Sequence, residues 1–404
     1  MAKQTYTFRL YPTRKQEQTF AWTLDRCREL YNAALQERKD AYRMAGKRIT
    51  YSDQANQLPE IKAVREEYQD IYSQILQDVL RRVEKAFQAF FRRVKHGEKP
   101  GYPRFRGAGR YDSFTYPQAG FSLTHDRRVA LSKIGSIKVK LHRRIEGTIK
   151  TCTIKREGNR WDVVFVCEIE PAPLPESDEA VGVDLGVLRF ATLSTGETIE
   201  NPRFLRKAER KLKRLQQSLA RKKRGSHRRK KAARRVATAH RKVRHQRRDF
   251  LHKESRKLVN RYGLMVFEAL RPANMVRRPT AKQDETGNFL PNGASAKAGL
   301  NKSMLDAGWS QFVQFCTYKA AWAGRRVVQV DPKHTSQICS SCGAVKKKDL
   351  SQRWHSCECG CELDRDHNAA LNIKRAGLLL LAKESQARTK PSEDVPLRSP
   401  AIHG

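Results

Sequence analysis

The sequence has no long hydrophobic run. Its leucine-rich stretch at residues 378–382 is far shorter than the roughly 18–20 apolar residues of a membrane-spanning helix. The first four residues, MAKQ, lead into no apolar core of a signal peptide. These absences argue against a membrane-spanning or secreted protein and predict a cytoplasmic one.

Acidic residues are scarce as well. The 404-residue chain has 42 Asp and Glu against 82 Lys and Arg, which gives a net charge of +40 and an isoelectric point of about 10.3. This excess is far beyond what solubility needs, and nucleic acid is the usual polyanion that balances it. On charge alone, a purely structural RNA-binding protein is an alternative to an enzyme. The length predicts two to four domains.

Nine cysteines in a chain without a signal sequence predict a reducing compartment, where metal binding is favoured over disulfides. Four of them stand singly, mostly within amphipathic patterns. These four are predicted to be buried, unreactive thiols: Cys27, Cys152, Cys167 and Cys316.

The N-terminal part of the chain predicts a strand followed by helices. Residues 5–11 alternate between apolar and polar and end at Pro12, as in a short strand. Residues 13–94 have helical periodicity, with two amphipathic runs, and the prolines and glycine at residues 100–103 end them.

A β-rich region and a linker follow. Residues 111–169 contain several short alternating runs, two of them joined by a hairpin turn at residues 157–160, which predicts a small antiparallel sheet or barrel. Residues 171–179 are rich in proline and acids and read as a linker, so a new domain is expected to start at Ala180.

Three acidic residues stand where strands or helices end. Asp184 follows an apolar run and precedes Gly186, Glu268 ends the apolar run 263–267, and Asp366 opens an Ala/Leu-rich helix. Each has an ordinary interpretation too, since Asp beside Gly often forms a turn and Glu268 could pair with Arg271. Together they predict hard oxygen ligands for Mg²⁺ or Mn²⁺ and metal-dependent phosphodiester cleavage. Their order of strand, strand and helix N-terminus is that of an RNase H-like fold.

A long basic insertion separates the first two acids. Between Arg203 and Arg248 the only acid is Glu209, and leucines recur at helical spacing. Gly225 breaks the stretch, which predicts a helical hairpin. After Phe204 and up to Arg248 this stretch has no Phe, Tyr or Trp, so duplex or folded RNA is favoured over stacking with single strands. The residues predicted to contact the nucleic-acid backbone are Arg221, Lys222, Lys223, Arg228, Arg229, Lys230, Lys231, Arg234 and Arg235.

Five cysteines near the C-terminus have the spacing of a zinc-knuckle pair. Cys339 and Cys342 form the first C-x-x-C-G knuckle. In the second, Cys359 precedes a glycine, and Cys357 is preferred over Cys361 as its partner. His334 and His355 are alternative ligands for the same metal ion. Four thiolates leave no open position for water, so the predicted role is structural.

Several segments resemble the TnpB nucleases encoded by bacterial insertion sequences, the compact relatives of type V CRISPR effectors. The similar segments within residues 5–376 are 8–12 (FRLYP), 101–106 (GYPRFR), 182–186 (GVDLG), 267–270 (FEAL), 319–324 (KAAWAG), 335–343 (TSQICSSCG) and 364–370 (DRDHNAA). One departure is the second knuckle, CECGC, where C-x-x-C-G is commoner, and this leaves the fourth zinc ligand open.

The resemblance implies an RNA-guided DNA endonuclease with a multidomain α+β fold. Residues 1–12 and 106–172 would form a wedge β-barrel, with residues 13–105 inserted as a helical recognition lobe. Residues 177–330 and 363–376 would form an RNase H-like RuvC nuclease domain that carries the basic insertion, residues 203–262. Residues 331–362 would be a zinc ribbon that binds the target. From their own composition, residues 287–299 are predicted to be a flexible loop that could act as a lid, and residues 382–404 a disordered tail.

The resemblance also implies partners. A guide RNA from the transposon end would pair with the target strand, one protein per guide RNA, while the protein reads a short transposon-adjacent motif in the DNA duplex. Asp184, Glu268 and Asp366 would hold Mg²⁺ or Mn²⁺, and the expected location is a bacterial or archaeal cytoplasm, at the nucleoid. The candidates for motif reading are Tyr51, Ser73, Gln74, Gln77 and Thr115.

Two rival functions use many of the same features. A DDE-type transposase also has an RNase H-like fold and metal-bound acids, but it is not expected to place its last acid after a zinc ribbon. An RNA-guided regulator would use the same basic surfaces without cutting DNA, and metal-dependent cleavage separates it from a nuclease.

Overall fold

The structure is a computed structural model, and it describes residues 1–349 and 352–389. The chain divides into two compact units, Met1–Pro171 and Ala172–Gly404. Each unit has its own sheet and its own hydrophobic core, so they are described separately.

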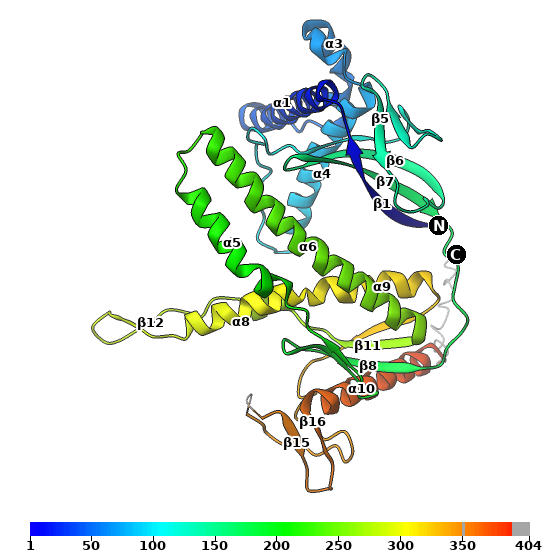
Figure 1. The fold of residues 1–404 in the computed structure, drawn as a ribbon, viewed down its shortest axis with the longest axis vertical. Coiled ribbons are helices and arrows are strands. Elements are labelled where there is room, and N and C mark those ends of the chain that lie inside the picture. The colour runs from blue at the N-terminus through cyan, green and yellow to red at the C-terminus, as the bar shows by residue number, and fades with distance from the viewer. Residues whose placement is uncertain (350–351, 390–404) are drawn as a thin grey trace, which may run out of the picture. The chain divides into compact units, whose positions relative to one another are not determined.

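The first unit is built on a curled seven-stranded sheet (Figure 1). Strand β1 (Ala2–Tyr11) lies inside it and pairs antiparallel with β7 and β5. The order is β2-β6-β7-β1-β5-β4-β3. The strands are β2 (Ser113–Tyr116), β3 (Phe121–Leu123), β4 (Arg128–Leu131), β5 (Gly135–Lys140), β6 (Thr148–Glu157) and β7 (Arg160–Ile169).

The sheet is curled rather than closed into the expected barrel by hydrogen bonds. Among the described strands, β2 and β3 stand at its two edges and do not pair with each other. Both are short, and Pro117, which has no backbone N–H to donate to a ladder, follows β2 directly.

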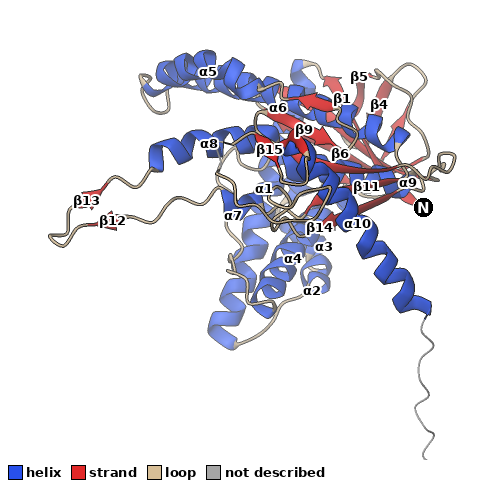
Figure 2. Ribbon diagram, turned by 90° about the horizontal axis from the view of Figure 1, so that it is seen from below, coloured by secondary structure: helices blue, strands red, loops and turns tan. Residues whose placement is uncertain are grey.

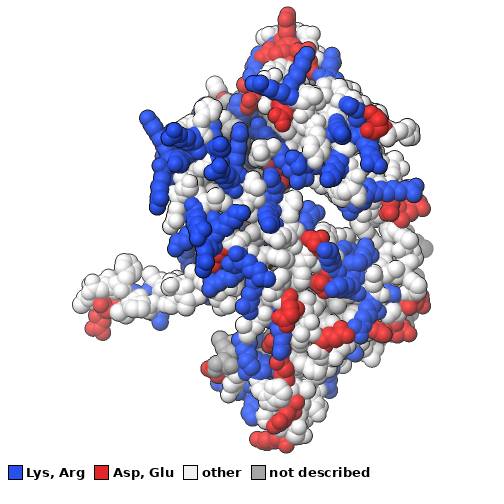
Figure 3. All heavy atoms as spheres, in the orientation of Figure 1, with Lys and Arg blue, Asp and Glu red and all other residues white. Residues whose placement is uncertain are grey.

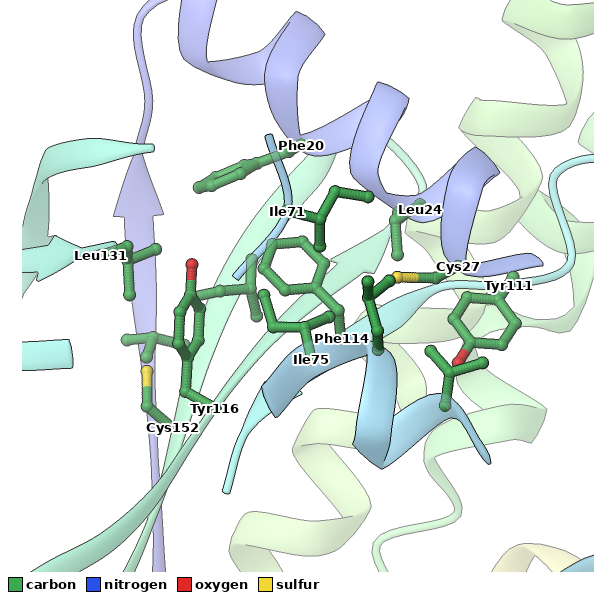
Figure 4. Close-up of a cluster of buried hydrophobic side chains, with 14 of the residues drawn as sticks. Phe20, Leu24, Cys27, Ile71, Ile75, Tyr111, Phe114, Tyr116, Leu131 and Cys152 are labelled. Atoms are coloured by element: carbon green, nitrogen blue, oxygen red, sulfur yellow. The ribbon is translucent and has the colours of Figure 1, made fainter. Parts of the chain in front are cut away.

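Helices cover this sheet and enclose the first core. Helix α1 (Arg14–Ala45) begins with a capping box at Thr13 and Gln16 and ends at Gly46, whose φ is +61°. Helix α4 (Ser73–Lys95) packs against α1 and β2. Figure 4 shows the side chains between them, where Phe20 and Cys27 of α1 meet Ile75 of α4 and Phe114 of β2. The shorter helices are α2 (Tyr51–Asn56), α3 (Leu58–Val64) and η1 (Glu66–Tyr68).

The second unit contains a mixed five-stranded sheet, in the order β10-β9-β8-β11-β14. Strand β8 (Ala180–Leu185) pairs antiparallel with β9 (Arg189–Leu193) and parallel with β11 (Leu264–Glu268). Strands β10 (Thr198–Glu200) and β14 (Arg326–Val330) form the edges. Strands β8, β9 and β11 are almost continuously apolar, as expected for strands that are buried on both faces.

The basic insertion forms the predicted helical hairpin, α5 (Phe204–Ala220) and α6 (His227–Arg261). Helix α6 runs well beyond residue 248, and its C-terminal half enters the core. There Leu251, Leu258 and Val259 pack in one cluster with Trp309 and Phe312 of α9 (Trp309–Trp322).

Helix α10 (Arg365–Thr389) crosses β8 and β11 at close range. It continues past residue 382, where a disordered tail was expected, because residues 383–389 contain no proline or glycine to end a helix. The rest of the predicted tail lies outside the described residues. None of the helices in the described part of the chain combines the length and the apolar character that a bilayer crossing requires.

The predicted lid differs from expectation as well. Helix α7 (Pro272–Met275) is followed by a hairpin of β12 (Lys282–Gln283) and β13 (Phe289–Leu290), and α8 (Ala294–Ala307) then begins (Figure 2). Residues 294–299 are therefore helical rather than a loop. Gly293, with φ +69°, precedes an alanine-rich run that favours helix. A small hairpin of β15 (Trp354–Ser356) and β16 (Glu362–Asp364) leads into α10.

Candidate functional site

Asp184 and Glu268 lie side by side at the carboxyl ends of adjacent parallel strands. The register pairs Val183 of β8 with Phe267 of β11, so the next residue on each strand is an acid. Asp184 itself pairs with Thr192 of β9, so it is a strand residue rather than a turn former. In a sheet of this kind, the carboxyl ends of the parallel strands are where ligands usually bind.

Asp366 enters the site from the first turn of α10. Asp364 caps this helix, because its Oδ1 accepts a hydrogen bond from the backbone N–H of Asp366 at 2.9 Å. The other carboxylate oxygen of Asp364 accepts a hydrogen bond from the Arg189 guanidinium of β9, also at 2.9 Å. The cap and this ion pair fix the end of the helix that carries the third acid.

Two glycines let α10 approach the sheet. A Cβ atom at Gly182 would lie 2.0 Å from the carbonyl oxygen of Ala370, and one at Gly377 would lie 2.4 Å from a methyl group of Val266. Gly182 is two residues before Asp184, and Ala370 is four after Asp366. The close approach therefore sets how near these two acids lie to each other.

Glu268 and Asp366 both act on the carboxyl group of Asp184. Loss of hydration, followed by the negative charges of Glu268 and Asp366, raises the pKa of Asp184 well above its usual range. Burial also raises the pKa of Glu268 and of Asp366, and the neighbouring charge of Asp364 adds to the second effect. Partly buried acids that repel one another are what a divalent cation would stabilise, and an all-oxygen donor set suits Mg²⁺ or Mn²⁺.

The acids are neighbours but are not yet arranged as a closed ligand set. Among the described residues, the groups of three or more potential ligands whose donor atoms all lie within 4.8 Å of one another contain cysteine, and the three acids do not form such a group.

Glu268 is hydrogen-bonded to a residue that sequence reasoning did not single out. The hydroxyl of Thr335 donates to its Oε1 at 2.5 Å, so Thr335 is its partner, where the ordinary alternative was a pair with Arg271. Two asparagines of α10 hold the same segment. Asn372 donates to the carbonyl oxygens of Thr335 and Ile338, and Asn368 donates to Ile338 and accepts from the N–H of Ser340.

The cysteine cluster lies at the end of this segment. The sulfur atoms of Cys339, Cys342, Cys357 and Cys359 all lie within 4.8 Å of one another. Cys339 and Cys359 are 3.7 Å apart, and Cys342 and Cys357 are 3.6 Å apart. Tetrahedral thiolates at about 2.3 Å from zinc lie about 3.8 Å from each other, so these sulfurs fit a zinc ion.

A second group of potential metal ligands contains Cys361, the alternative to Cys357 in the second knuckle. Cys361 and the buried His355 form another close group with Cys339. His334 belongs to neither group, and its Nδ1 lies 2.9 Å from the Oε1 of Gln337.

The basic hairpin presents lysines and arginines over both of its helices, as the blue surface in Figure 3 shows. Between residues 204 and 248 its buried residues are few: Leu212, Ala232 and Val243. Arg229 differs from its neighbours, because its guanidinium donates to the carbonyl oxygens of Leu219 and Lys222. It closes the turn between α5 and α6, while Arg228, Lys230 and Lys231 are exposed.

The five predicted motif-reading residues all lie in the first unit. Ser73 accepts a hydrogen bond from Lys62, and Gln74 accepts one from the N–H of Ala119. Tyr51 lies under the guanidinium of Arg81, and Gln77 is on α4. The hydroxyl of Thr115 contacts both Arg82 and Thr153, so it is already engaged inside the protein.

The four single cysteines are buried, as predicted. Burial raises the pKa of Cys27 and of Cys316 to about 12, and those of Cys152 and Cys167 rise as well, so all four thiols are protonated near neutral pH. Of the residues that sequence reasoning missed, Asp364 had a readable signal, since an acid two residues before Asp366 is typical of a helix N-cap. Thr335 and Asn368 lie in segments that resemble the family, but nothing in the sequence indicated their partners or those of Asn372, because these are distant in the chain.

The fold resembles that of a known effector. The cryo-EM structure of a Cas12f1–sgRNA–target DNA complex matches with a TM-score of 0.56 over 92% of this chain and 98% of the other, at 13% identity. This likeness defines the class of fold as that of the Cas12f1-type proteins.

Sequence comparison identifies the family. The profile described as "Probable transposase" of the IS605 OrfB type matches residues 164–278, and the "Cas12f1-like, TNB domain" matches residues 309–373. A "Helix-turn-helix domain" profile matches residues 1–47, which here form β1 and the single helix α1. The "Putative RNA-guided DNA endonuclease InsQ" of Escherichia coli (strain K12) is 33% identical over 94% of this chain and 93% of its own length. A "Putative RNA-guided DNA endonuclease" of Streptomyces pristinaespiralis is 33% identical over 93% and 90%. The chain belongs to the TnpB family, whose profile carries the IS605 OrfB name.

Proposed function

We propose that this chain is an RNA-guided DNA endonuclease of an insertion sequence, which cleaves double-stranded DNA beside a short transposon-adjacent motif. The names of its relatives in Escherichia coli and Streptomyces support the class of activity. The observation that carries the proposal is the juxtaposition of Asp184, Glu268 and Asp366, each delivered by a different element of one sheet-and-helix unit.

The second unit is proposed to be an RNase H-like, RuvC-type nuclease domain. Its sheet has an antiparallel meander, β8 to β10, followed by two parallel strands on the other side of β8. Numbered within the sheet, this is the order 3-2-1-4-5 of RNase H-like folds. The finer division into wedge, recognition lobe, RuvC halves and zinc ribbon is proposed with the bounds given above.

The three acids are proposed to hold the divalent ions. When bound, Mg²⁺ or Mn²⁺ supplies activation of water and charge stabilisation of the leaving oxygen in phosphodiester hydrolysis. The chain contributes the placement: adjacent strands fix Asp184 and Glu268, the Asp364 cap fixes Asp366, and Thr335 orients Glu268. One such site would cut both DNA strands in turn.

The cysteine cluster is proposed to hold a structural zinc ion through Cys339, Cys342, Cys357 and Cys359. Four sulfurs complete a tetrahedral shell, so this metal leaves no position for a water nucleophile. Two metals with separate tasks would therefore lie at the two ends of one segment, residues 335–342.

The nucleic-acid partners are proposed to be a guide RNA from the transposon end and a target DNA duplex. Pairing between guide and target strand would read the sequence, and the protein would bind the backbone and the adjacent motif. The exposed cations of the α5–α6 hairpin suit phosphates, and the motif-reading candidates Tyr51, Ser73, Gln74 and Gln77 remain proposals, with Thr115 the weakest because of its internal hydrogen bonds.

The test is plasmid cleavage by protein reconstituted with its guide RNA, run beside a gel-shift assay. Asp184→Ala, Glu268→Gln and Asp366→Ala are expected to lose nearly all cleavage and to keep binding of guide and target. Glu200→Gln is the matched control, because Glu200 is an exposed acid on β10 of the same sheet. If one of these three variants cuts at the wild-type rate, the acid that it replaces is not a ligand of the catalytic metal. Binding by the wild type without cleavage in any cation would favour the regulator.

A further inference from the structure

A group of aromatic rings lies at the C-terminal end of α4 and on the segment that follows it. Phe91, Tyr102 and Phe105 are 53%, 45% and 50% exposed. The ring of Tyr102 stands 5.7 Å from Phe87 and 5.4 Å from Phe90, in edge-to-face contacts. Phe91 also contacts Phe87 and Phe90, so Phe91 and Tyr102 belong to one cluster of rings, and Phe105 follows Tyr102 by three residues on the same segment. Exposed aromatic clusters of this kind usually mark an interaction site rather than ordinary surface.

The exposure is not the result of a loosely attached loop. Residues 97–110 have no helix or strand. The side chain of Asn32 on α1 nevertheless forms two hydrogen bonds with the backbone of Arg106. It accepts from the N–H of Arg106 at 2.8 Å and donates to its carbonyl oxygen at 3.0 Å. The Arg106 guanidinium also lies over the Tyr31 ring at 5.4 Å. The segment is thus anchored immediately after Phe105.

Cationic residues flank these rings in the sequence. Arg92, Arg93 and Arg104 lie beside them in sequence, and Glu98 is the only acid among residues 91–106. A Cβ atom at Gly101 would lie 3.3 Å from the guanidinium of Arg93, so the turn before Tyr102 passes directly over that arginine. An apolar protein partner would leave this positive charge unbalanced, whereas a nucleotide offers both an aromatic base and an anionic phosphate.

We propose that this aromatic patch, formed by Phe91, Tyr102 and Phe105 with Arg92, Arg93 and Arg104, binds unpaired nucleobases by stacking while the arginines bind the adjacent phosphates. The inference rests on the proposed function for the presence of nucleic acid. It assigns the first unit a mode of binding that the α5–α6 hairpin lacks, because that hairpin has no aromatic residue after Phe204 up to Arg248. The bases belong either to the guide RNA or to unpaired target DNA.

Photo-crosslinking of the full complex identifies the source. Iodouracil is placed either in the guide RNA or in the DNA, and crosslinked peptides are mapped after irradiation. Crosslinks to Phe91, Tyr102 or Phe105 are expected with at least one of the two labelled nucleic acids. The one that crosslinks is the strand whose bases the patch binds. Crosslinks that fall elsewhere on the protein, with none between residues 87 and 106 in either arm, would overturn the proposal.

Binding of oligo(U) and oligo(dT) of matched length gives a second measurement. Tyr102→Ala and Phe105→Ala are each expected to weaken binding of at least one probe about 5- to 150-fold, as for loss of one stacked base. Tyr102→Phe should restore it. Tyr42→Ala is the control, because Tyr42 is 71% exposed on α1, outside the patch. Unchanged affinity for both probes in the two alanine variants would overturn the proposal.

The two proposals can fail separately. If the wild type does not cleave DNA but the patch variants bind more weakly, the stacking site stands and the nuclease does not. If the wild type cleaves and the patch variants bind as it does, the reverse holds. Melting temperatures should fall only modestly in the alanine variants, because the substituted rings are about half exposed and lose only their buried contacts.

Discussion

Thr335 and Glu268 are joined by a 2.5 Å hydrogen bond between residues 67 positions apart in the chain. Thr335 lies four residues before Cys339, and Asn372 of α10 donates to its carbonyl oxygen. One residue therefore connects an acid of the sheet, the helix that carries Asp366 and the segment that leads to the cysteine cluster.

Removing the Thr335 hydroxyl should slow cleavage. Thr335→Val keeps the branched shape but loses the donor, and hydrogen bonds to charged groups contribute about 1.5–3 kcal/mol, so single-turnover cleavage should fall roughly tenfold or more. Thr335→Ser keeps a hydroxyl and should stay near the wild-type rate. Zinc content should be the same in both variants. A valine variant as fast as wild type would show that the hydrogen bond does not position Glu268.

Neutralising Asp184 should stabilise the magnesium-free protein. The raised pKa of Asp184 means that the folded state binds its proton more tightly than the unfolded state does. The resulting penalty on the charged form is absent below the unfolded-state pKa and grows as the pH rises from there to the folded-state pKa, so stability falls with rising pH in that window. Asp184→Asn should therefore raise the melting temperature at neutral pH, by roughly 2–4 °C for each kcal/mol removed.

Differential scanning calorimetry in Mg²⁺-free buffer without a chelator measures the Asp184 effect while leaving zinc in place. Added Mg²⁺ should raise the melting temperature of wild type and not that of Asp184→Asn. Equal melting temperatures of the two proteins at every pH would contradict the expectation.

The fourth zinc ligand can be assigned with a matched pair of variants. Cys357→Ser should lose zinc, because its sulfur lies 3.6 Å from that of Cys342 within the four-sulfur group. Cys361→Ser should retain it. Atomic emission of the purified variants gives the metal content, and the region 335–362 should become protease-sensitive wherever zinc is lost. The opposite result would assign Cys361 and bring His355 into consideration.

Adding one methyl group at Gly182 should disable the site. Gly182→Ala places a Cβ atom 2.0 Å from the Ala370 carbonyl oxygen, so α10 must move away and carry Asp366 with it. Cleavage should be lost, and stability should fall by about 1–3 kcal/mol, as for other overpacked cores. Gly299→Ala is the control, since nothing lies within 4 Å of its Cβ position in α8 and alanine favours helix by about 1 kcal/mol. Full activity of Gly182→Ala would show that the close packing is not needed.

Phosphate binding by the basic hairpin should appear in the salt dependence of affinity. Arg228→Glu, Lys230→Glu and Lys231→Glu should each reduce the slope of log affinity against log salt by about 0.7–0.9 if the replaced side chain neutralises one phosphate. Arg229 is left intact, because it closes the α5–α6 turn. Arg229→Gln should lower stability in addition to binding. A slope unchanged in the triple variant would place these side chains in solvent.

The sequence predicted those parts of the fold that depend on local pattern. Apolar strand runs that end in Asp184 and Glu268 and the break at Gly225 each follow from a few adjacent residues, and the structure has strands and a helical hairpin there. The helix at the end of the predicted lid, residues 294–299, was not predicted, because the glycine, proline and asparagine before it outweighed the alanines within it.

Contacts between residues that are distant in the chain could not be predicted from local sequence patterns. The meeting of Gly182 with Ala370 and the hydrogen bond from Thr335 to Glu268 each join residues far apart in the chain, whose proximity is created by packing. That β2 and β3 are unpaired edges of the sheet could not be predicted for the same reason, because closure of a barrel depends on pairing between strands and not on the strands themselves.

Helix α6 joins the cationic hairpin to the core without a break, since it runs from His227 to Arg261 and buries Leu251, Leu258 and Val259 near its end. Each residue of an α-helix advances the direction of its side chain by about 100°. An insertion of one residue between Val243 and Leu251 would thus turn every cation of the outer half away from its present direction while the core half stayed fixed. Insertions of about seven, eleven or eighteen residues return nearly to the same phase, so the length of α6 determines which way the positive face of the hairpin points.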